Sequence, residues 1–169
     1  MSSGKSKHFA ASRWTAGLVF GGLLVLGFGL TARAYSEDGG YDNRLEGTWR
    51  AQLTVSDCQT GAVLRTFPAR FAFAKGGTLT VTTAGQPPSL NTPGLGVWRH
   101  TVGHSYSAVS EAFIFSTAGV WTQTQRLTRL IHVGIGGDTF TDIVALEILD
   151  TNGNVIVTGC GTTVASRME

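Results

Sequence analysis

An alternating run of apolar and polar residues, from Trp49 to Ser56, is the feature that most limits how this chain can fold. The odd positions carry Trp, Ala, Leu and Val, and the even positions carry Arg, Gln, Thr and Ser. A two-residue period is typical of a strand with one buried face and one solvated face. The run therefore predicts a β-strand whose odd-numbered side chains face a core.

Further strand-like segments follow this first one, separated by turn residues. They span residues 64–73, 78–83, 96–102, 105–116, 120–133, 139–149 and 155–167. Eight strands in succession, joined mainly by short turns, are enough to close an up-and-down sheet on itself. We therefore expect an all-β domain over residues 45–169, a single eight-stranded antiparallel barrel. A two-sheet sandwich is the main alternative, and it would usually need longer crossovers.

Residues 1–34 have the features of a secretory signal peptide. Basic residues precede an apolar run from Thr15 to Leu30, and Ala32-Arg33-Ala34 supplies a small-x-small cleavage site. A retained membrane anchor is the alternative, but about sixteen apolar residues with several glycines are short for a span. We expect cleavage after Ala34, a secreted or periplasmic location without a stable membrane anchor, and a flexible polar segment over residues 35–44.

The distribution of charge argues against a nucleic-acid partner. Four of the thirteen basic residues precede Tyr35, whereas all eleven acidic residues follow it. Without the leading segment, nine basic and eleven acidic side chains remain, and they form no basic stripe. We expect no nucleic-acid binding, and the sequence makes no prediction of the oligomeric state.

The two cysteines lie on the first and last predicted strands, Cys58 at the end of one and Cys160 inside the other. Because disulfides persist in oxidising compartments, a Cys58–Cys160 bond is the expected state in an exported chain, with two reduced thiols as the alternative. If the first and last strands pair antiparallel, the register that brings Cys58 to Cys160 also brings Trp49 near Arg167.

Gly47-x-Trp49 at the start of the first strand and Arg167 near the end of the last resemble the lipocalins and their wider calycin relatives. In those proteins a Gly-x-Trp begins strand one, and an Arg of the last strand packs on the Trp. The succession of strands matches the family pattern over residues 45–167, whereas the family motif is matched by three residues only. It implies structural roles for Gly47, Trp49 and Arg167 in a secreted bacterial barrel of calycin type.

The histidines of the mature chain do not predict a metal site. His100, His104 and His132 lack the spacing and strand parity of metal ligands, so we interpret them as turn and surface residues. The chain also has no Gly-x-Ser-x-Gly, no phosphate loop and no His-Glu-x-x-His. We therefore expect no metal, no cofactor and no catalytic residue.

Ionisable residues on the strands offer only weak candidates for chemistry. We expect the strand acids Glu111, Asp142 and Glu147 to be solvated and to face outward. The sixth predicted strand also carries Gln125, Arg126 and Arg129, whose side chains could donate to an anionic group, and the sequence leaves open which face of the strand they take. Related barrels include isomerases and cyclases, so a barrel enzyme is a third alternative, although the sequence favours a protein that is not an enzyme.

The sequence favours a barrel that binds a small apolar or amphipathic ligand. Its expected ligand-binding side chains are the aromatic residues Trp49, Phe67, Phe71, Phe73, Trp98 and Trp121. Small residues decide how much room is left: a cluster at one end would leave a cavity, whereas interleaving with the aromatics would give a solid interior. A filled structural or interaction barrel displayed outside the cell is the alternative function.

Overall fold

The structure is a computed structural model that describes residues 43–169. The expected signal peptide at residues 1–34, and all but the last two residues of the expected flexible segment, lie outside the described residues. Within residues 43–169, no helix is long and apolar enough to cross a membrane.

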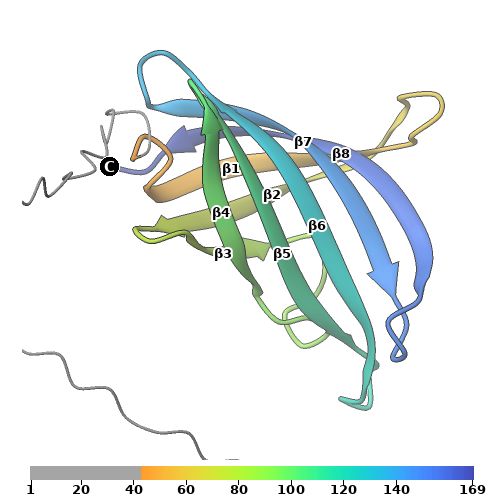
Figure 1. Cartoon of the computed structure of the whole chain (residues 1–169). Coiled ribbons are helices and arrows are strands. Elements are labelled where there is room, and N and C mark those ends of the chain that lie inside the picture. The colour runs from red at the N-terminus through yellow and green to blue at the C-terminus, as the bar shows by residue number, and fades with distance from the viewer. Residues whose placement is uncertain (1–42) are drawn as a thin grey trace, which may run out of the picture. The chain divides into compact units, whose positions relative to one another are not determined.

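Eight β-strands make up the described chain. They are β1 (Gly47–Ser56), β2 (Val63–Ala74), β3 (Thr78–Thr83), β4 (Gly94–Val102), β5 (Ser105–Phe115), β6 (Trp121–Val133), β7 (Thr139–Leu149) and β8 (Val155–Arg167). Each strand pairs antiparallel with its neighbours in sequence, and β1 also pairs with β8, so the sheet closes into a barrel. The predicted eight-stranded up-and-down barrel is confirmed (Figure 1).

The two ends of the barrel differ. At the Trp49 end, where β1 begins, short turns at residues 75–77, 103–104 and 134–138 join the strands. At the disulfide end, where β1 finishes, the connections are residues 57–62, 84–93, 116–120 and 150–154. The strands spread apart toward this second end in Figure 1. The pairing is shortest at β3, which has six residues and pairs with β4 over only four of them.

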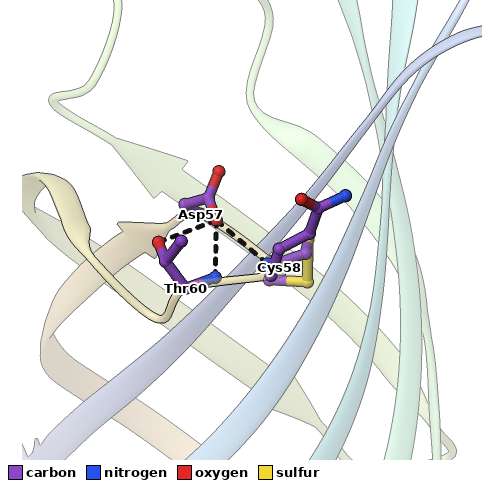
Figure 2. Close-up of a disulfide and its surroundings, with 5 residues drawn as sticks. Asp57, Cys58 and Thr60 are labelled. Carbon is purple, nitrogen blue, oxygen red and sulfur yellow. Dashed lines mark hydrogen bonds between the residues drawn. A yellow bond between two sulfur atoms is a disulfide. The ribbon is translucent and has the colours of Figure 1, made fainter.

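The disulfide predicted between Cys58 and Cys160 is confirmed. It joins the β1–β2 turn to β8, with the two Cα atoms 5.2 Å apart. The turn is held by Asp57, whose carboxylate accepts hydrogen bonds from the backbone N–H groups of Gln59 and Thr60 and from the Thr60 hydroxyl (Figure 2). These hydrogen bonds lower the pKa of the Asp57 carboxyl below its ordinary value, and the bond from the Thr60 backbone N–H has the largest effect.

Alternation along the strands separates the inside of the barrel from its outside. On β1 and β2 the side chains of Trp49, Ala51, Leu53, Ala69 and Phe71 are buried, whereas those between them are exposed or partly exposed. Pro68 pairs with Gln52 of β1 and lies one residue beyond the β2–β3 ladder, where its carbonyl accepts from the Ala84 N–H at 2.9 Å and its missing N–H costs no ladder bond. The irregularity in the β1–β2 pairing lies elsewhere, between Val55 and Ser56.

Candidate functional site

Four of the six aromatic residues predicted to bind a ligand lie in a packed core at the Trp49 end. Trp49, Phe71, Phe73 and Trp98 are each at least 93% buried. Phe140 of β7, which the sequence reasoning did not single out, packs its ring 5.0 to 6.0 Å from the ring centroids of Trp49, Phe71 and Phe73. These contacts are edge-to-face, the arrangement that aromatic pairs favour. This half of the barrel is filled by its own side chains.

The other two predicted residues lie apart from that core. Phe67 is half-buried toward the disulfide end of β2. Trp121 is 41% exposed and packs against Phe113, which is also exposed. The pairing of β5 with β6 shifts register between Ile114 and Phe115, just before Phe115 pairs with Trp121. Alternation along the strand therefore did not indicate whether the Trp121 side chain faces into or out of the barrel. The structure therefore does not bring the six aromatics together into one site.

The small residues are interleaved with the large ones. Ala165, Ala51 and Ala69 lie opposite one another on β8, β1 and β2 and form one buried row. The next row toward the Trp49 end contains Trp49 and Phe71, and the next row in the other direction contains Leu53 and Phe67. Large and small side chains alternating in this way fill space at the density of a protein interior.

A charged pair lies inside the barrel: Arg129, whose face the sequence left open, and Asp142, which was expected to face solvent. Arg129 of β6 is fully buried. Its Nη1 donates hydrogen bonds to Asp142 Oδ2 at 2.5 Å and to Thr163 Oγ1 at 3.0 Å. Its guanidinium also lies 4.8 Å from the centroid of the Phe71 ring. The expectation that Asp142 faces solvent was wrong: it is 5% exposed. Burying this carboxylate is tolerable because Arg129 compensates its charge.

The other two strand acids considered from the sequence, Glu111 and Glu147, do face outward. Arg126 lies between Glu111 and Glu147 on three neighbouring strands, with 2.7 Å from its Nε to Glu111 Oε1 and 3.7 Å from its Nη1 to Glu147 Oε2. The hydrogen bond to Glu111 raises the pKa of Arg126 above its ordinary value. These exposed groups form a surface ion-pair row, and such pairs contribute little stability.

Four buried polar atoms near the middle of the barrel have no hydrogen-bond partner within the described chain. They are Ser110 Oγ, Arg129 Nε, Arg129 Nη2 and Asp142 Oδ1. Two small spaces lie in the half of the barrel nearer the disulfide end: one of about 10 Å³ beside Ser110, and one of about 30 Å³ lined by Leu53, Phe67 and Leu146 among others. Spaces of this size hold about one or two water molecules. Neither accommodates an organic ligand without movement of side chains.

A larger concave surface lies on the outside of the barrel, where β3 ends and the chain leaves β2. We call it the proline groove, and its volume is about 700 Å³. Apolar residues form much of its lining, which consists of Pro68, Ala69, Arg70, Thr82, Thr83, Ala84, Gly85, Gln86, Pro87 and Pro88. No pattern in the sequence indicated this groove, although two of its prolines, Pro87 and Pro88, belong to the long loop between β3 and β4.

Phe67 and Gly85 separate the proline groove from the inner space of about 30 Å³. Thr83, Gly85 and Gln86 line both, whereas Phe67 lines only the inner one. A Cβ atom on Gly85 would lie 2.8 Å from the Phe67 ring, so the glycine allows the ring to pack directly against the backbone. Arg65 covers the same ring at 4.8 Å from its centroid and donates to Gly85 O at 3.0 Å.

The histidines form contacts at the Trp49 end. The rings of His104 and His132 stack with centroids 6.0 Å apart, and His100 packs edge-to-face on Tyr106. Among residues 43–169, no three His, Cys, Asp or Glu side chains are placed to hold a metal ion.

Comparison with known proteins finds no family model that matches the chain and no significant match among curated proteins. The eight-stranded closed barrel is consistent with the calycin architecture that the Gly47, Trp49 and Arg167 motif implies.

Proposed function

We propose that this protein is exported and binds a small apolar or amphipathic ligand, and that the ligand occupies the proline groove. The observation that carries the proposal is the concave, largely apolar surface of about 700 Å³ beside Pro68 and Ala84. Ligand sites are typically mostly apolar hollows of about 300–1,000 Å³. The interior aromatics predicted from sequence then stabilise the barrel wall, and Phe67 alone among them lies near the ligand.

The chemistry of the groove favours binding over catalysis. Among the residues that line it, Arg70 is the one ionisable side chain. A guanidinium stays protonated in proteins and cannot act as a general base. Asp142, the one buried carboxylate among the described residues, pairs with Arg129 inside the barrel. The groove supplies apolar area and hydrogen-bond donors, which suit a bound ligand.

Two observations support export. The Cys58–Cys160 disulfide fits an oxidising compartment outside the cytoplasm. The first 34 residues combine a basic start, an apolar run and a cleavage site. Intact-mass analysis of protein from the native host should find a mature chain that begins at Tyr35, and a chain that still begins at Met1 would disprove cleavage.

Calorimetric titration of the exported protein with dodecanol, a neutral single-chain probe, tests the groove. We expect saturable binding that Ala84→Arg abolishes, because a charged side chain would then occupy the apolar lining. The matched control is Leu95→Arg, since Leu95 is 64% exposed on β4 and does not line the groove. Equal loss of binding in both variants, or no binding by the parent protein, would contradict the proposal.

A second function, that of a filled barrel acting through its outer surface, is favoured by the packed core and by exposed apolar side chains on β4 to β7. These side chains are Leu95, Val97, Val109, Leu130 and Ile143, with exposures between 38% and 67%. An apolar outer face of this kind marks a surface for protein contacts. This function predicts that the protein binds no dodecanol and that Leu130→Arg disrupts an association with a second protein.

A further inference from the structure

Two arginines lie directly opposite each other on the outside of the barrel, next to the proline groove. Arg50 of β1 pairs in register with Arg70 of β2, and both are exposed. Side chains directly opposite in an antiparallel sheet have Cβ atoms about 4.5–5.5 Å apart, and like charges at that spacing destabilise the sheet. Neither arginine forms an ion pair with any carboxylate in residues 43–169. The fold thus concentrates two uncompensated positive charges.

The neighbours of this arginine pair on the adjacent strands carry hydroxyl groups that can donate hydrogen bonds, and no acidic residue lines the hollow beside the pair. Ser166 lies opposite Arg50 on β8, Thr139 lies opposite Ser166 on β7, and Thr82 lies opposite Arg70 on β3. Arg50, Arg70, Thr139 and Ser166 line one hollow of about 420 Å³. Arg70 Nη1 donates to Ala69 O at 2.9 Å, which helps to fix its guanidinium beside the sheet. Guanidinium and hydroxyl donors in one hollow are suited to an oxyanion.

This hollow continues into the proline groove, because Pro68 and Arg70 line both. An apolar surface and a basic hollow therefore lie end to end on the outer wall formed by β8, β1, β2 and β3. A ligand that fits both has an apolar chain and an anionic head.

We propose that the protein binds a single-chain alkyl phosphate, with the phosphate monoester between Arg50 and Arg70 and the chain in the proline groove. This inference rests on the proposed function and specifies the head group of the ligand. A phosphate monoester carries a charge of about −1.5 to −2 at pH 7, which matches two guanidiniums. An alkyl carboxylate or an alkyl sulfate carries a single charge and leaves one arginine uncompensated.

The inner arginine does not serve the same purpose. The charge of Arg129 is already compensated by Asp142, and the pair is enclosed by the barrel. A second anion beside it would lie in a region of low dielectric without a counter-charge. The two outer arginines are the described groups whose charge and access both suit a dianion.

The test is a set of titrations of the exported protein with dodecyl phosphate, dodecyl sulfate, dodecanol and inorganic phosphate, all below micelle concentrations, and with vesicles that contain phosphatidic acid. We expect dodecyl phosphate to bind at least roughly tenfold more tightly than dodecanol, since a hydrogen-bonded charge contributes that much or more. Arg50→Gln should remove most of that difference while leaving dodecanol binding unchanged, because Arg50 does not line the proline groove. Arg70→Gln should weaken the binding of dodecyl phosphate more than that of dodecanol, because Arg70 lines both the hollow and the groove. Arg99→Gln is the matched control, because Arg99 is exposed on β4 and donates to Ser107 outside the hollow.

Thermal unfolding shows whether the variants stay folded. Without ligand, Arg50→Gln and Arg70→Gln should melt at the same temperature as the parent or higher, because each removes a like-charge contact. Dodecyl phosphate should then raise the melting temperature of the parent protein and of Arg99→Gln by more than that of the other two variants, in which only the chain still binds favourably.

The other outcomes separate this inference from the proposed function. Equal affinity for dodecanol and dodecyl phosphate would overturn the head-group assignment and leave the groove intact. Failure of both probes to bind would overturn both proposals. Binding of inorganic phosphate as tight as that of dodecyl phosphate would indicate a simple anion site. Binding only to vesicles that contain phosphatidic acid would indicate contact with a membrane surface, and either result would overturn the inference.

Discussion

The guanidinium of Arg167 lies over the ring of Trp49, 4.2 Å from its centroid, and joins the last strand of the barrel to the first. Its N–H groups also donate to the backbone oxygens of Arg44, Glu46 and Gly137 at 2.6 to 3.2 Å. Gly47 makes this arrangement possible: its φ is +115°, and a Cβ there would lie 2.7 Å from Arg167 Nη1. The side chain therefore closes the Trp49 end and connects three chain segments distant in sequence.

Replacing Arg167 with Met should lower the free energy of unfolding by about 3 kcal/mol, because several carbonyl groups lose a charged donor and a cation–π contact is lost. Arg167→Lys should recover only part of the loss, since an ammonium cannot reproduce the planar fork of donors. Denaturant unfolding measures both changes. A Lys variant as stable as the parent protein would show that charge alone closes this end.

Gly47→Ala should destabilise the protein by about 1–3 kcal/mol, because an L-residue is strained at this φ and its Cβ would displace Arg167. The control is Gly61→Ala, where φ is also positive at +73° but no atom lies within 4 Å of the added Cβ. Equal losses in the two variants would mean that backbone strain, and not the contact with Arg167, explains the need for glycine at position 47.

Removing one partner of the buried Arg129–Asp142 pair should be costly. Arg129→Met leaves the Asp142 carboxylate buried without a counter-charge, for an expected loss of about 3–5 kcal/mol. The double variant Arg129→Met with Asp142→Leu should recover most of that loss, since no buried charge remains. Urea unfolding of Arg129→Met, of Asp142→Leu and of the double variant measures the coupling free energy between the two side chains. A double variant no more stable than Arg129→Met would contradict this account.

The disulfide should contribute about 3 kcal/mol of stability, within the range expected for a bond that closes a long loop. Here the sequence separation is 102 residues. Cys58→Ala with Cys160→Ala should unfold at the same denaturant concentration as the reduced parent protein, and at a lower concentration than the oxidised protein. Equal midpoints for the oxidised and reduced parent would contradict the prediction.

The turn at Asp57 should make stability depend on pH in the acid range. The pKa of Asp57 is lowered in the folded state, so its stabilising effect is fully present above the ordinary aspartate pKa of about 3.9 and is lost as pH falls through the folded value. The difference in melting temperature between the parent and Asp57→Ala should therefore be largest near neutral pH and shrink below about pH 4. A constant difference from pH 7 to pH 2 would show that the carboxylate charge is not involved.

Much of the fold could be predicted from the sequence because alternation and turn residues act locally. The residues of β1 and β2 alternate clearly. The register that places Trp49 opposite Arg167 also places Ser56 opposite Cys160, and Cys58 in the turn two residues further on forms the disulfide with Cys160. Side-chain polarity alone could not predict which residues of β6 and β7 face the interior of the barrel. On β7 the polar Asp142 faces inward and the apolar Ile143 faces outward, since compensation by Arg129 outweighs side-chain polarity. The available signal for a buried charge was that Arg129 lies on the same face of β6 as the apolar Leu127 and Ile131.

The groove could not be predicted because it depends on where neighbouring strands stop. β3 ends at Thr83 while β2 continues past Pro68 toward the disulfide end, and the chain from Ala84 to Pro88 crosses the space that this leaves. Strand lengths relative to one another are a property of the assembled sheet. For the same reason, the arginine pair follows from the β1–β2 register and not from any local motif.

The most direct test of the account is to locate a bound chain by intermolecular nuclear Overhauser effects between dodecyl phosphate and methyl groups of the protein. The account predicts contacts from the chain to the methyl groups of Ala84 and Thr82 on the groove. It predicts none to the methyl groups of Leu79 and Val133, which are fully buried in the packed core and line neither the groove nor the hollow. Contacts to those interior methyls, without contacts to Ala84, would place the ligand inside the barrel and contradict the account.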